Sequence, residues 1–206
     1  NRQGYVTQLI CDCPHLFNTG FNRVFNGAYQ IRGQEADIDL LHMNDPIIPV
    51  MPRDKTRTGY HFQDRNLVDL HRWTNRYPTR EDETFPYRTS AHVVRWLEEN
   101  DSYRPFFLWV DFFDPHEPWD PPEYMVRKYD PTYTDTPMLH PNYGKADDYT
   151  AAELRNLRAH YCAEAELVDR WIGRIFQKLG DLNLWDNTIV IFTTDHGMSL
   201  GEHNRT

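Results

Sequence analysis

A carboxylate and an imidazole stand side by side in this sequence at Asp195 and His196, directly after the apolar, β-branched run at residues 188–192. A carboxylate oxygen and an imidazole nitrogen are both ligands of divalent metal ions. The glycine that follows, Gly197, lets the backbone turn away tightly. The pair is therefore a candidate metal site, although a strand end with a polar turn is the ordinary explanation of so short a motif.

Two more histidines occupy the same kind of position. His116 follows the apolar run at residues 106–110 and lies in a loop with four prolines among the eight residues 115–122. His15 follows a similar run at residues 4–10. Each histidine alone has an ordinary structural explanation, but three polar strand ends together are stronger evidence for a functional site than one. Because open α/β sheets bind ligands beyond the carboxyl ends of their strands, the three positions predict one site.

The rest of the sequence predicts the helices that hold these strand ends in place. Residues 150–179 carry apolar side chains at steps of three and four, the pattern of an amphipathic helix. Thr150 and Glu153 match a capping box at its start, and Gly180 fits the position after its end. A second helix is expected at residues 89–100. Strands separated by helices predict an α/β fold, a three-layer α/β/α sandwich with a largely parallel sheet. The charged residues of the long helix are expected to form a solvated face: Glu164, Glu166, Asp169 and Arg170.

Composition limits the possible functions. The length suits one globular domain, residues 1–206, and an irregular insertion is expected at about 18–88. The net charge of −9 argues against nucleic-acid binding, which needs a basic surface. No run approaches the roughly 18 apolar residues of a membrane span, so no membrane partner is expected. No signal peptide is visible, which leaves the compartment undetermined, with export or a periplasmic location open. The cysteines do not form a disulfide framework: Cys11, Cys13 and Cys162.

Several stretches together resemble the sulfatases of the alkaline phosphatase superfamily. The most specific are residues 106–122, FFLWVDFFDPHEPWDPP, and residues 188–203, TIVIFTTDHGMSLGEH. Residues 4–16, 31–35 and 167–171 are also similar, so the resemblance covers nearly the whole chain. It implies an enzyme that hydrolyses sulfate esters with a cysteine oxidised to formylglycine and a divalent metal, usually calcium, with manganese or magnesium as alternatives. The implied substrate is a sulfated small molecule or carbohydrate.

The resemblance also implies roles for the residues singled out above. Asp195 and His196 match the second pair of metal ligands. His116 matches the histidine that hydrogen-bonds the substrate oxyanion, and His15 matches the histidine near the formylglycine. His203 lies where family members place a group near the leaving oxygen. A cation and preorganised donors suit the charge that develops on the transferred group and the leaving oxygen, and a histidine can deliver a proton there.

The sequence departs from the family pattern in two ways that matter. None of its cysteines lies in a C-x-P-x-R motif, and the paired aspartates of the first half of the metal site are absent. Because the chain begins at Asn1 without a methionine, we expect an internal piece of a longer protein that holds these parts upstream. We therefore predict that the isolated chain is inactive and binds metal weakly. We also expect an exposed sheet edge that could support an oligomer.

Two other functions stay open on sequence grounds. The longer protein could be a phosphonate monoester or phosphodiester hydrolase of the same superfamily, in which Asp-His ligands also occur. The chain could also be a non-catalytic carbohydrate-binding module, which would bind without metal. Its aromatic candidates for stacking on sugars are Trp119, Tyr124, Tyr129, Tyr133 and Tyr143.

Overall fold

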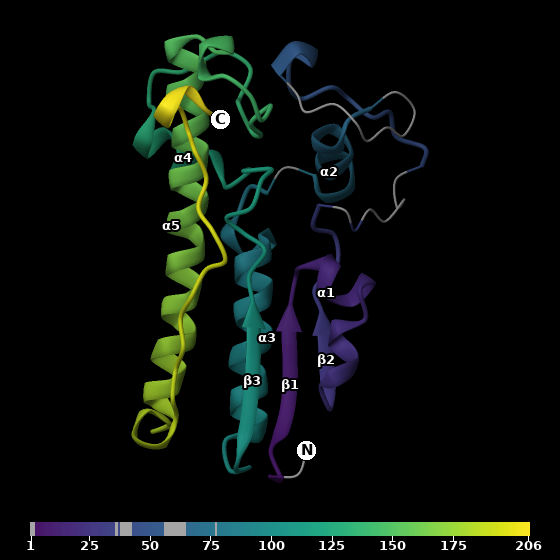
Figure 1. Ribbon diagram of the computed structural model, residues 1–206, viewed down its shortest axis with the longest axis vertical. Helices are drawn as coiled ribbons and strands as arrows, with labels where there is room; N and C mark the ends of the chain where they lie inside the picture. Colours follow the sequence, from purple (N-terminus) through teal and green to yellow (C-terminus); the bar gives the residue numbers. More distant parts are fainter. Residues whose placement is uncertain (1–2, 36, 38–42, 56–64, 77) are drawn as a thin grey trace.

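The computed structural model describes residues 3–35, 37, 43–55, 65–76 and 78–206. Its centre is a three-stranded parallel sheet with the strand order β2-β1-β3 (Figure 1). Gln8 of β1 pairs with Gly27 of β2 on one side and with Leu108 of β3 on the other. The strands are β1 (Val6–Cys11), β2 (Gly27–Gln30) and β3 (Phe106–Asp111). The α-helices are α1 (Pro14–Asn18), α2 (Leu67–Asn75), α3 (Phe85–Asn100), α4 (Glu123–Tyr129) and α5 (Ala151–Asp181).

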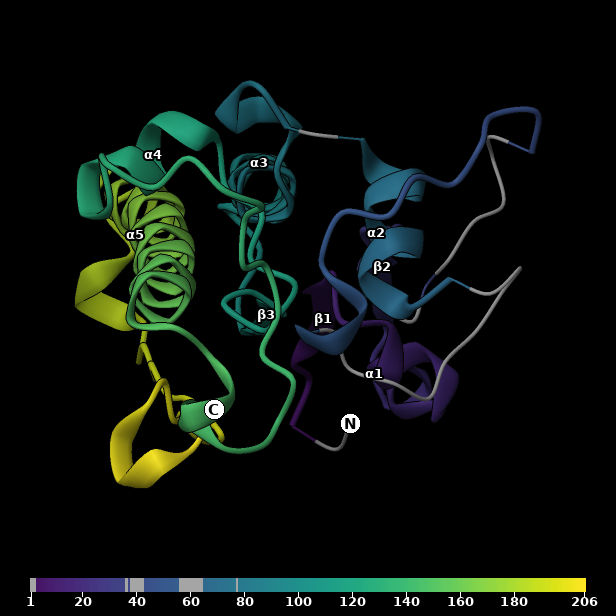
Figure 2. The ribbon, with the colours of Figure 1, turned by 90° about the horizontal axis from the view of Figure 1, so that it is seen from above.

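Helices α3 and α5 cover one face of the sheet (Figure 2). Val93 and Leu97 of α3 form one apolar cluster with Ile175 of α5 and Ile10 of β1, and Leu108 of β3 packs against this cluster. The short helices that follow β1 lie toward the other face. There, Phe25 stacks on Phe107 of β3 with ring centroids 6.2 Å apart, and the ring of Phe21 meets Trp109 edge-on at 5.5 Å. This arrangement of layers confirms the predicted α/β fold.

The long helix confirms most of what its sequence predicts. The Thr150 hydroxyl accepts a hydrogen bond from the Glu153 N–H at 3.2 Å, and the Glu153 carboxylate accepts one from the Thr150 N–H at 2.7 Å. This is the expected capping box. Two details were wrong. The helix continues through Gly180 to Asp181. Glu164 is buried and not solvated. Helix α5 packs against both α3 and α4, so this part of its surface is covered.

The other elements differ from the sequence prediction in extent. Helix α3 begins at Phe85, four residues before the expected start, because Thr84 is extended and Pro86 suits the first turn of a helix. Residues 18–88 contain strand β2 and helix α2, although the sequence shows little periodicity there. Helix α2 is capped by Asn66, whose side chain accepts from the Asp69 N–H at 2.9 Å. Among the described residues, no helix is both long and apolar enough to cross a membrane.

The segment at residues 188–192 is the main correction to the predicted fold. Its apolar run predicted a strand buried on both faces, but the segment pairs with none of the strands that the structure describes. It is extended and runs beside α5 toward the C-terminus (Figure 1). Ile189 is 90% exposed and Ile191 is 83% exposed. An apolar run of this kind becomes a buried strand only where neighbouring strands pair with it, and among the described residues none does.

Candidate active site

The carboxyl ends of β1 and β3 are fastened together by one buried carboxylate, Asp12. Its Oδ1 accepts a hydrogen bond from the Phe113 N–H at 2.6 Å, and its Oδ2 accepts one from the Thr89 hydroxyl at 2.9 Å. These bonds tie the end of β1 to the loop after β3 and to helix α3. Burial raises the pKa of Asp12 from its ordinary 3.8 to about 7. Asp12 thus fixes the relative positions of the strand ends at which the predicted site lies.

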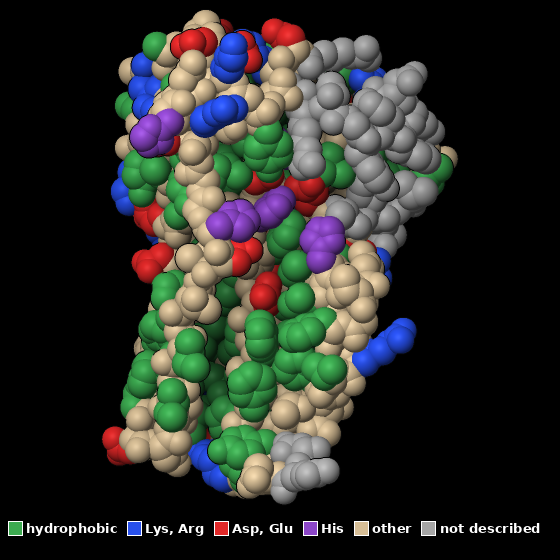
Figure 3. All heavy atoms as spheres, viewed as in Figure 1, with side chains coloured by type: hydrophobic (Ala, Val, Ile, Leu, Met, Phe, Trp, Pro, Cys, Tyr) green, Lys and Arg blue, Asp and Glu red, His purple; other side chains and the backbone are tan. Residues whose placement is uncertain are grey.

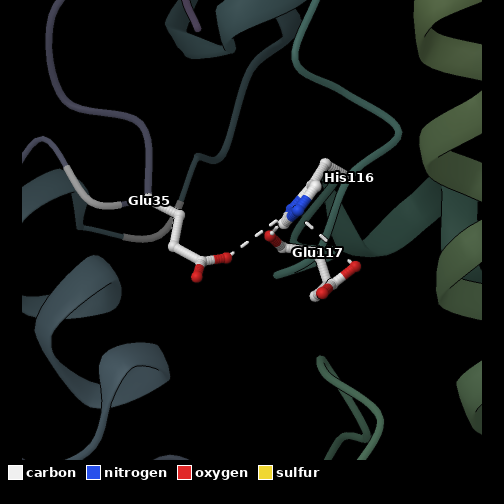
Figure 4. Close-up of side chains that lie close together, drawn as sticks. All are labelled: Glu35, His116 and Glu117. Carbon is white, nitrogen blue, oxygen red and sulfur yellow. Dashed lines mark hydrogen bonds and ion pairs between the residues drawn. The ribbon is translucent and has the colours of Figure 1, made fainter. Parts of the chain in front are cut away.

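His116 lies in the loop after β3. Oxygen atoms around its ring set the orientation of the ring (Figure 4). Its Nδ1 is 2.7 Å from the carbonyl oxygen of Glu117. Since a carbonyl can only accept, Nδ1 must carry the proton and donate it. The same nitrogen is 3.6 Å from the Glu35 carboxylate and 3.7 Å from the Glu117 carboxylate. The other ring nitrogen, Nε2, is therefore the one left for a substrate, and the side chain is about one-third exposed.

The two glutamates place negative charge behind His116. Glu117 is completely buried, and neither of its carboxylate oxygens makes a hydrogen bond to the described chain. Its Oε1 is 3.8 Å from Nε2 of the buried His140. Potential ligand atoms of Glu35, His116 and Glu117 lie within 4.8 Å of one another, which is compact enough for a metal ion. A cation at Nδ1 would displace the proton that this nitrogen donates, so the cluster is better suited to holding an imidazole than a metal.

His15 and His116 both contact the same aromatic ring. Phe113 stacks on His116 with centroids 4.1 Å apart and meets His15 at 6.0 Å. His15 is in the first turn of α1, directly after β1, and its side chain is exposed. The fold thus brings these two predicted residues to one end of the sheet, although they are 101 positions apart in the sequence.

Asp195 and His196 form an exposed pair on the segment that runs beside α5. The His196 Nδ1 donates to the Gly197 carbonyl at 2.9 Å, which leaves Nε2 with a free electron pair 3.6 Å from Oδ2 of Asp195. These two atoms can share one divalent cation. Burial raises the pKa of Asp111, the Trp109 hydrogen bond lowers it, and the charge of Asp195 raises it further, so Asp195 lies near the end of β3. Figure 3 shows histidine side chains gathered with acidic groups across this part of the molecule.

His203 is placed differently from the other predicted site residues. It lies in the short 3-10 helix at Glu202–Asn204, which packs against the turn at Ala146–Asp148. The backbone of His203 has a positive φ of 54°, and Figure 1 shows this turn beside the upper end of α5, above the strand ends. The structure therefore groups His203 with the start of α5, and its predicted role near a leaving group stays a prediction.

Buried acidic residues continue behind the site. Asp114 and Glu164 help to line a small polar cavity of about 60 Å³, and burial raises the pKa of both carboxyl groups well above the usual range. Gln34 donates a hydrogen bond to Asp114 at 2.6 Å, which fixes the backbone beside Glu35. Asp120 behaves differently, because His71 and the bonded Arg72 lower its pKa against the effect of burial.

Comparison with known proteins decides the family. A family model described as Sulfatase matches residues 1–206. The chain belongs to the sulfatase family. This sulfatase is 26% identical over 160 residues to the arylsulfatase of Clostridium perfringens, a match that covers 68% of the chain and 33% of that protein. It is 30% identical over 233 residues to arylsulfatase K of Rattus norvegicus, which covers 99% of the chain and 36% of that protein.

A solved structure supports the same fold. The phosphonate monoester hydrolase of Agrobacterium radiobacter superposes with a TM-score of 0.54 at 20% identity, over 90% of this chain and 44% of that one. At this identity the likeness concerns the fold alone. This sulfatase spans about a third of the length of the two curated relatives named above. Its fold is thus an alkaline-phosphatase-like α/β fold, as its sequence predicted.

Sequence reasoning missed Glu35 and Glu117 as members of the site. Glu117 directly follows His116, but nothing in the sequence distinguishes a buried carboxylate from a solvated loop residue. Glu35 lies 81 positions before His116, and only the path of the chain after β2 brings the two together. The similarity of residues 31–35 to a sulfatase subgroup was the one available signal for Glu35.

Proposed function

We propose that these 206 residues carry part of the active site of a metal-dependent sulfuric ester hydrolase. The observation that carries this proposal is the state of His116. Its Nδ1–H is committed to the Glu117 carbonyl, and its Nε2 faces away from that bond at the carboxyl end of β3. Family membership supplies the reaction class, and this geometry supplies a residue able to perform a step of it.

The chemistry of sulfate ester hydrolysis suits this arrangement. Negative charge develops on the sulfuryl oxygens and on the leaving oxygen, so donors held in place beforehand stabilise the transition state. Because Nδ1 is bonded to the Glu117 carbonyl, Nε2 is the ring nitrogen of His116 that would meet a sulfuryl oxygen. His15, which contacts the same Phe113 ring, would act on the nucleophile side, as the family motif implies. For His203 we retain the role of a proton donor near the leaving oxygen, in keeping with the family motif.

Asp195 and His196 fit a divalent cation by their donor chemistry. A carboxylate oxygen and an unprotonated imidazole nitrogen lie 3.6 Å apart on adjacent, exposed side chains. We propose that they hold calcium, with manganese or magnesium as alternatives. The bound ion would supply positive charge to the sulfate oxygens and the nucleophile. Calcium takes about six to eight oxygen ligands, so two residues alone would bind it weakly.

The missing half of the site defines the expected activity. No cysteine of this chain lies in a C-x-P-x-R motif, so a formylglycine nucleophile would come from outside these residues. We therefore expect the isolated chain to be inactive and a completed domain, these residues together with the rest of a sulfatase domain, to hydrolyse a sulfated small molecule or carbohydrate. Turnover of 4-nitrophenyl sulfate by the isolated chain, abolished by His116→Ala, would refute this expectation.

A second reaction of the same site stays open: the hydrolysis of a phosphonate monoester or a phosphodiester. The donor chemistry of the Asp195–His196 pair is compatible with it. The ratio of kcat/KM for 4-nitrophenyl sulfate and for a phenylphosphonate monoester, measured with the completed domain, separates the two. A ratio in favour of the phosphonate would overturn the sulfatase assignment.

The carbohydrate-binding module finds little support in the aromatic residues. Trp119 is fully buried, and its indole N–H donates to the Pro115 carbonyl at 2.9 Å. The Tyr124 and Tyr129 hydroxyls donate to carboxylates of Glu81 and Glu166, so both rings have structural partners.

A further inference from the structure

The small polar cavity beside the loop that carries His116 has a strongly acidic lining. Its walls come from the end of α2, the start of α3, the loop after β3 and the middle of α5. Its volume is about 60 Å³, and because one water molecule needs roughly 10–15 Å³ of such space, the cavity has room for an ion with some of its waters. Four acidic residues line it: Glu83, Asp114, Asp120 and Glu164.

Two of these carboxylates are buried without a positive charge beside them. Glu164 is only 3% exposed, and its Oε2 has no hydrogen-bond partner in the described chain. Asp114 is 6% exposed, and its described partner is the neutral amide of Gln34 at 2.6 Å. Burial raises the pKa of both carboxyl groups, as expected where the negative charge is not compensated. A buried polar atom without a partner indicates a missing ligand or water.

The other charged groups of the lining already have partners. Asp120 accepts a hydrogen bond from Arg72 at 2.5 Å. Glu83 accepts one from the Thr79 N–H at 2.8 Å. Arg88 donates to a backbone carbonyl at 3.2 Å, and it forms no ion pair with either of the two buried carboxylates described above. Two negative charges are therefore left facing the cavity, and one divalent cation would balance them.

We propose that this cavity binds one magnesium ion with several of its waters, and that Asp114 and Glu164 are its carboxylate ligands. One ion cannot touch three acidic groups of the lining at once, because the group of three described residues close enough for that lies elsewhere, around His116. Magnesium suits such a site, since it keeps several waters and needs only one or two carboxylates, whereas calcium takes about six to eight oxygens. The ion would join α5 to the loop that carries His116, and it is distinct from a cation at Asp195 and His196.

The test counts the ions bound by the 206-residue chain and needs no enzymatic activity. Asp195→Ala and His196→Ala are introduced together first, so that the exposed pair does not contribute to binding; both side chains are largely exposed, which suits them to replacement. Mn²⁺ serves as the probe, because it accepts the same octahedral oxygen ligands as Mg²⁺. Free Mn²⁺ is quantified by its electron paramagnetic resonance spectrum, and Mg²⁺ is then added as a competitor.

The proposal predicts that about one Mn²⁺ stays bound per chain and that Mg²⁺ displaces it. Glu164→Gln and Asp114→Asn should each weaken binding by about tenfold or more. Glu166→Gln, which removes a surface partner of Lys128 on the same helix, should change the affinity by less than about twofold.

A stability measurement separates lost binding from lost folding. In urea without metal, Glu164→Gln should be at least as stable as its parent, because a neutral amide replaces a buried carboxylate that lacks a partner. Three outcomes would each overturn the proposal: no bound Mn²⁺, equal affinities of Glu164→Gln and Glu166→Gln, or binding that is lost in Glu117→Gln and kept in Glu164→Gln.

Discussion

Replacing Asp12 with asparagine should remove a large part of the pH dependence of folding stability. Asp12 is fully buried, and desolvation is the main reason that its pKa rises from 3.8 to about 7. A raised pKa means that the folded state binds the proton more tightly than the unfolded state does. Between about pH 4 and pH 7 the unfolded chain therefore releases this proton first, and stability falls as pH rises.

The magnitude follows from the same two values. One pKa unit corresponds to ~1.4 kcal/mol, so the penalty reaches up to ~4 kcal/mol at pH 8, and about 2–3 kcal/mol of it develops between pH 5 and pH 8. The amide introduced by Asp12→Asn would keep the bond from the Phe113 N–H through its oxygen and would donate to the Thr89 hydroxyl through its nitrogen. The shape of the site is thus retained while its charge is removed.

The assay is urea denaturation of wild type, Asp12→Asn and the exposed control Asp101→Asn at pH 5 and pH 8. The wild type and the control should lose stability between these two pH values, and Asp12→Asn should lose about 2 kcal/mol less than they do. Asp114 and Glu164 also have raised pKa values, so a residual slope is expected in the variant. An unchanged slope in Asp12→Asn would refute the assignment of this charge penalty to Asp12.

Three further variants test other parts of the structure. Glu117→Gln should lower kcat of the completed domain more than it changes KM, because it removes charge behind His116, and Glu123→Gln, on the surface of α4, should change neither. Leu97→Ala should lower the free energy of unfolding by about 2–5 kcal/mol in urea denaturation, since this side chain is buried between α3 and the sheet; a loss below roughly 1 kcal/mol would contradict that packing. Thr150→Ala should cost about 1 kcal/mol in the same measurement by removing the cap of α5, and no loss would show that the capping box does not contribute.

The parts of the fold that the sequence predicted are those governed by local patterns. The strands at β1 and β3 and the capping box of α5 follow from apolar runs and from side chains three residues apart. Strand β2 escaped prediction because its four residues, Gly27–Gln30, carry too short a pattern. The burial of Glu164 was not predicted, because the sequence of a helix does not show which neighbouring elements will cover its polar face.

The site divides in the same way. His116 and His15 were predicted from their positions after strands, and the fold brings both against Phe113. Glu35 could not be predicted from spacing, because its contact with His116 depends on the whole path between β2 and β3. The buried strand predicted at residues 188–192 is absent from the described sheet, because an apolar run does not specify the partner strands that would bury it.

The central claim is that His116 acts on the sulfuryl group, and its most direct test is the hydrolysis of 4-nitrophenyl sulfate by the completed domain. His116→Ala is compared with His92→Ala, a histidine on α3 that stacks on Tyr29 with centroids 4.2 Å apart. The account predicts that His116→Ala lowers kcat/KM by about 100-fold or more, as expected for loss of a transition-state donor, while His92→Ala stays within about twofold of wild type. Equal activities of the two variants would contradict the account.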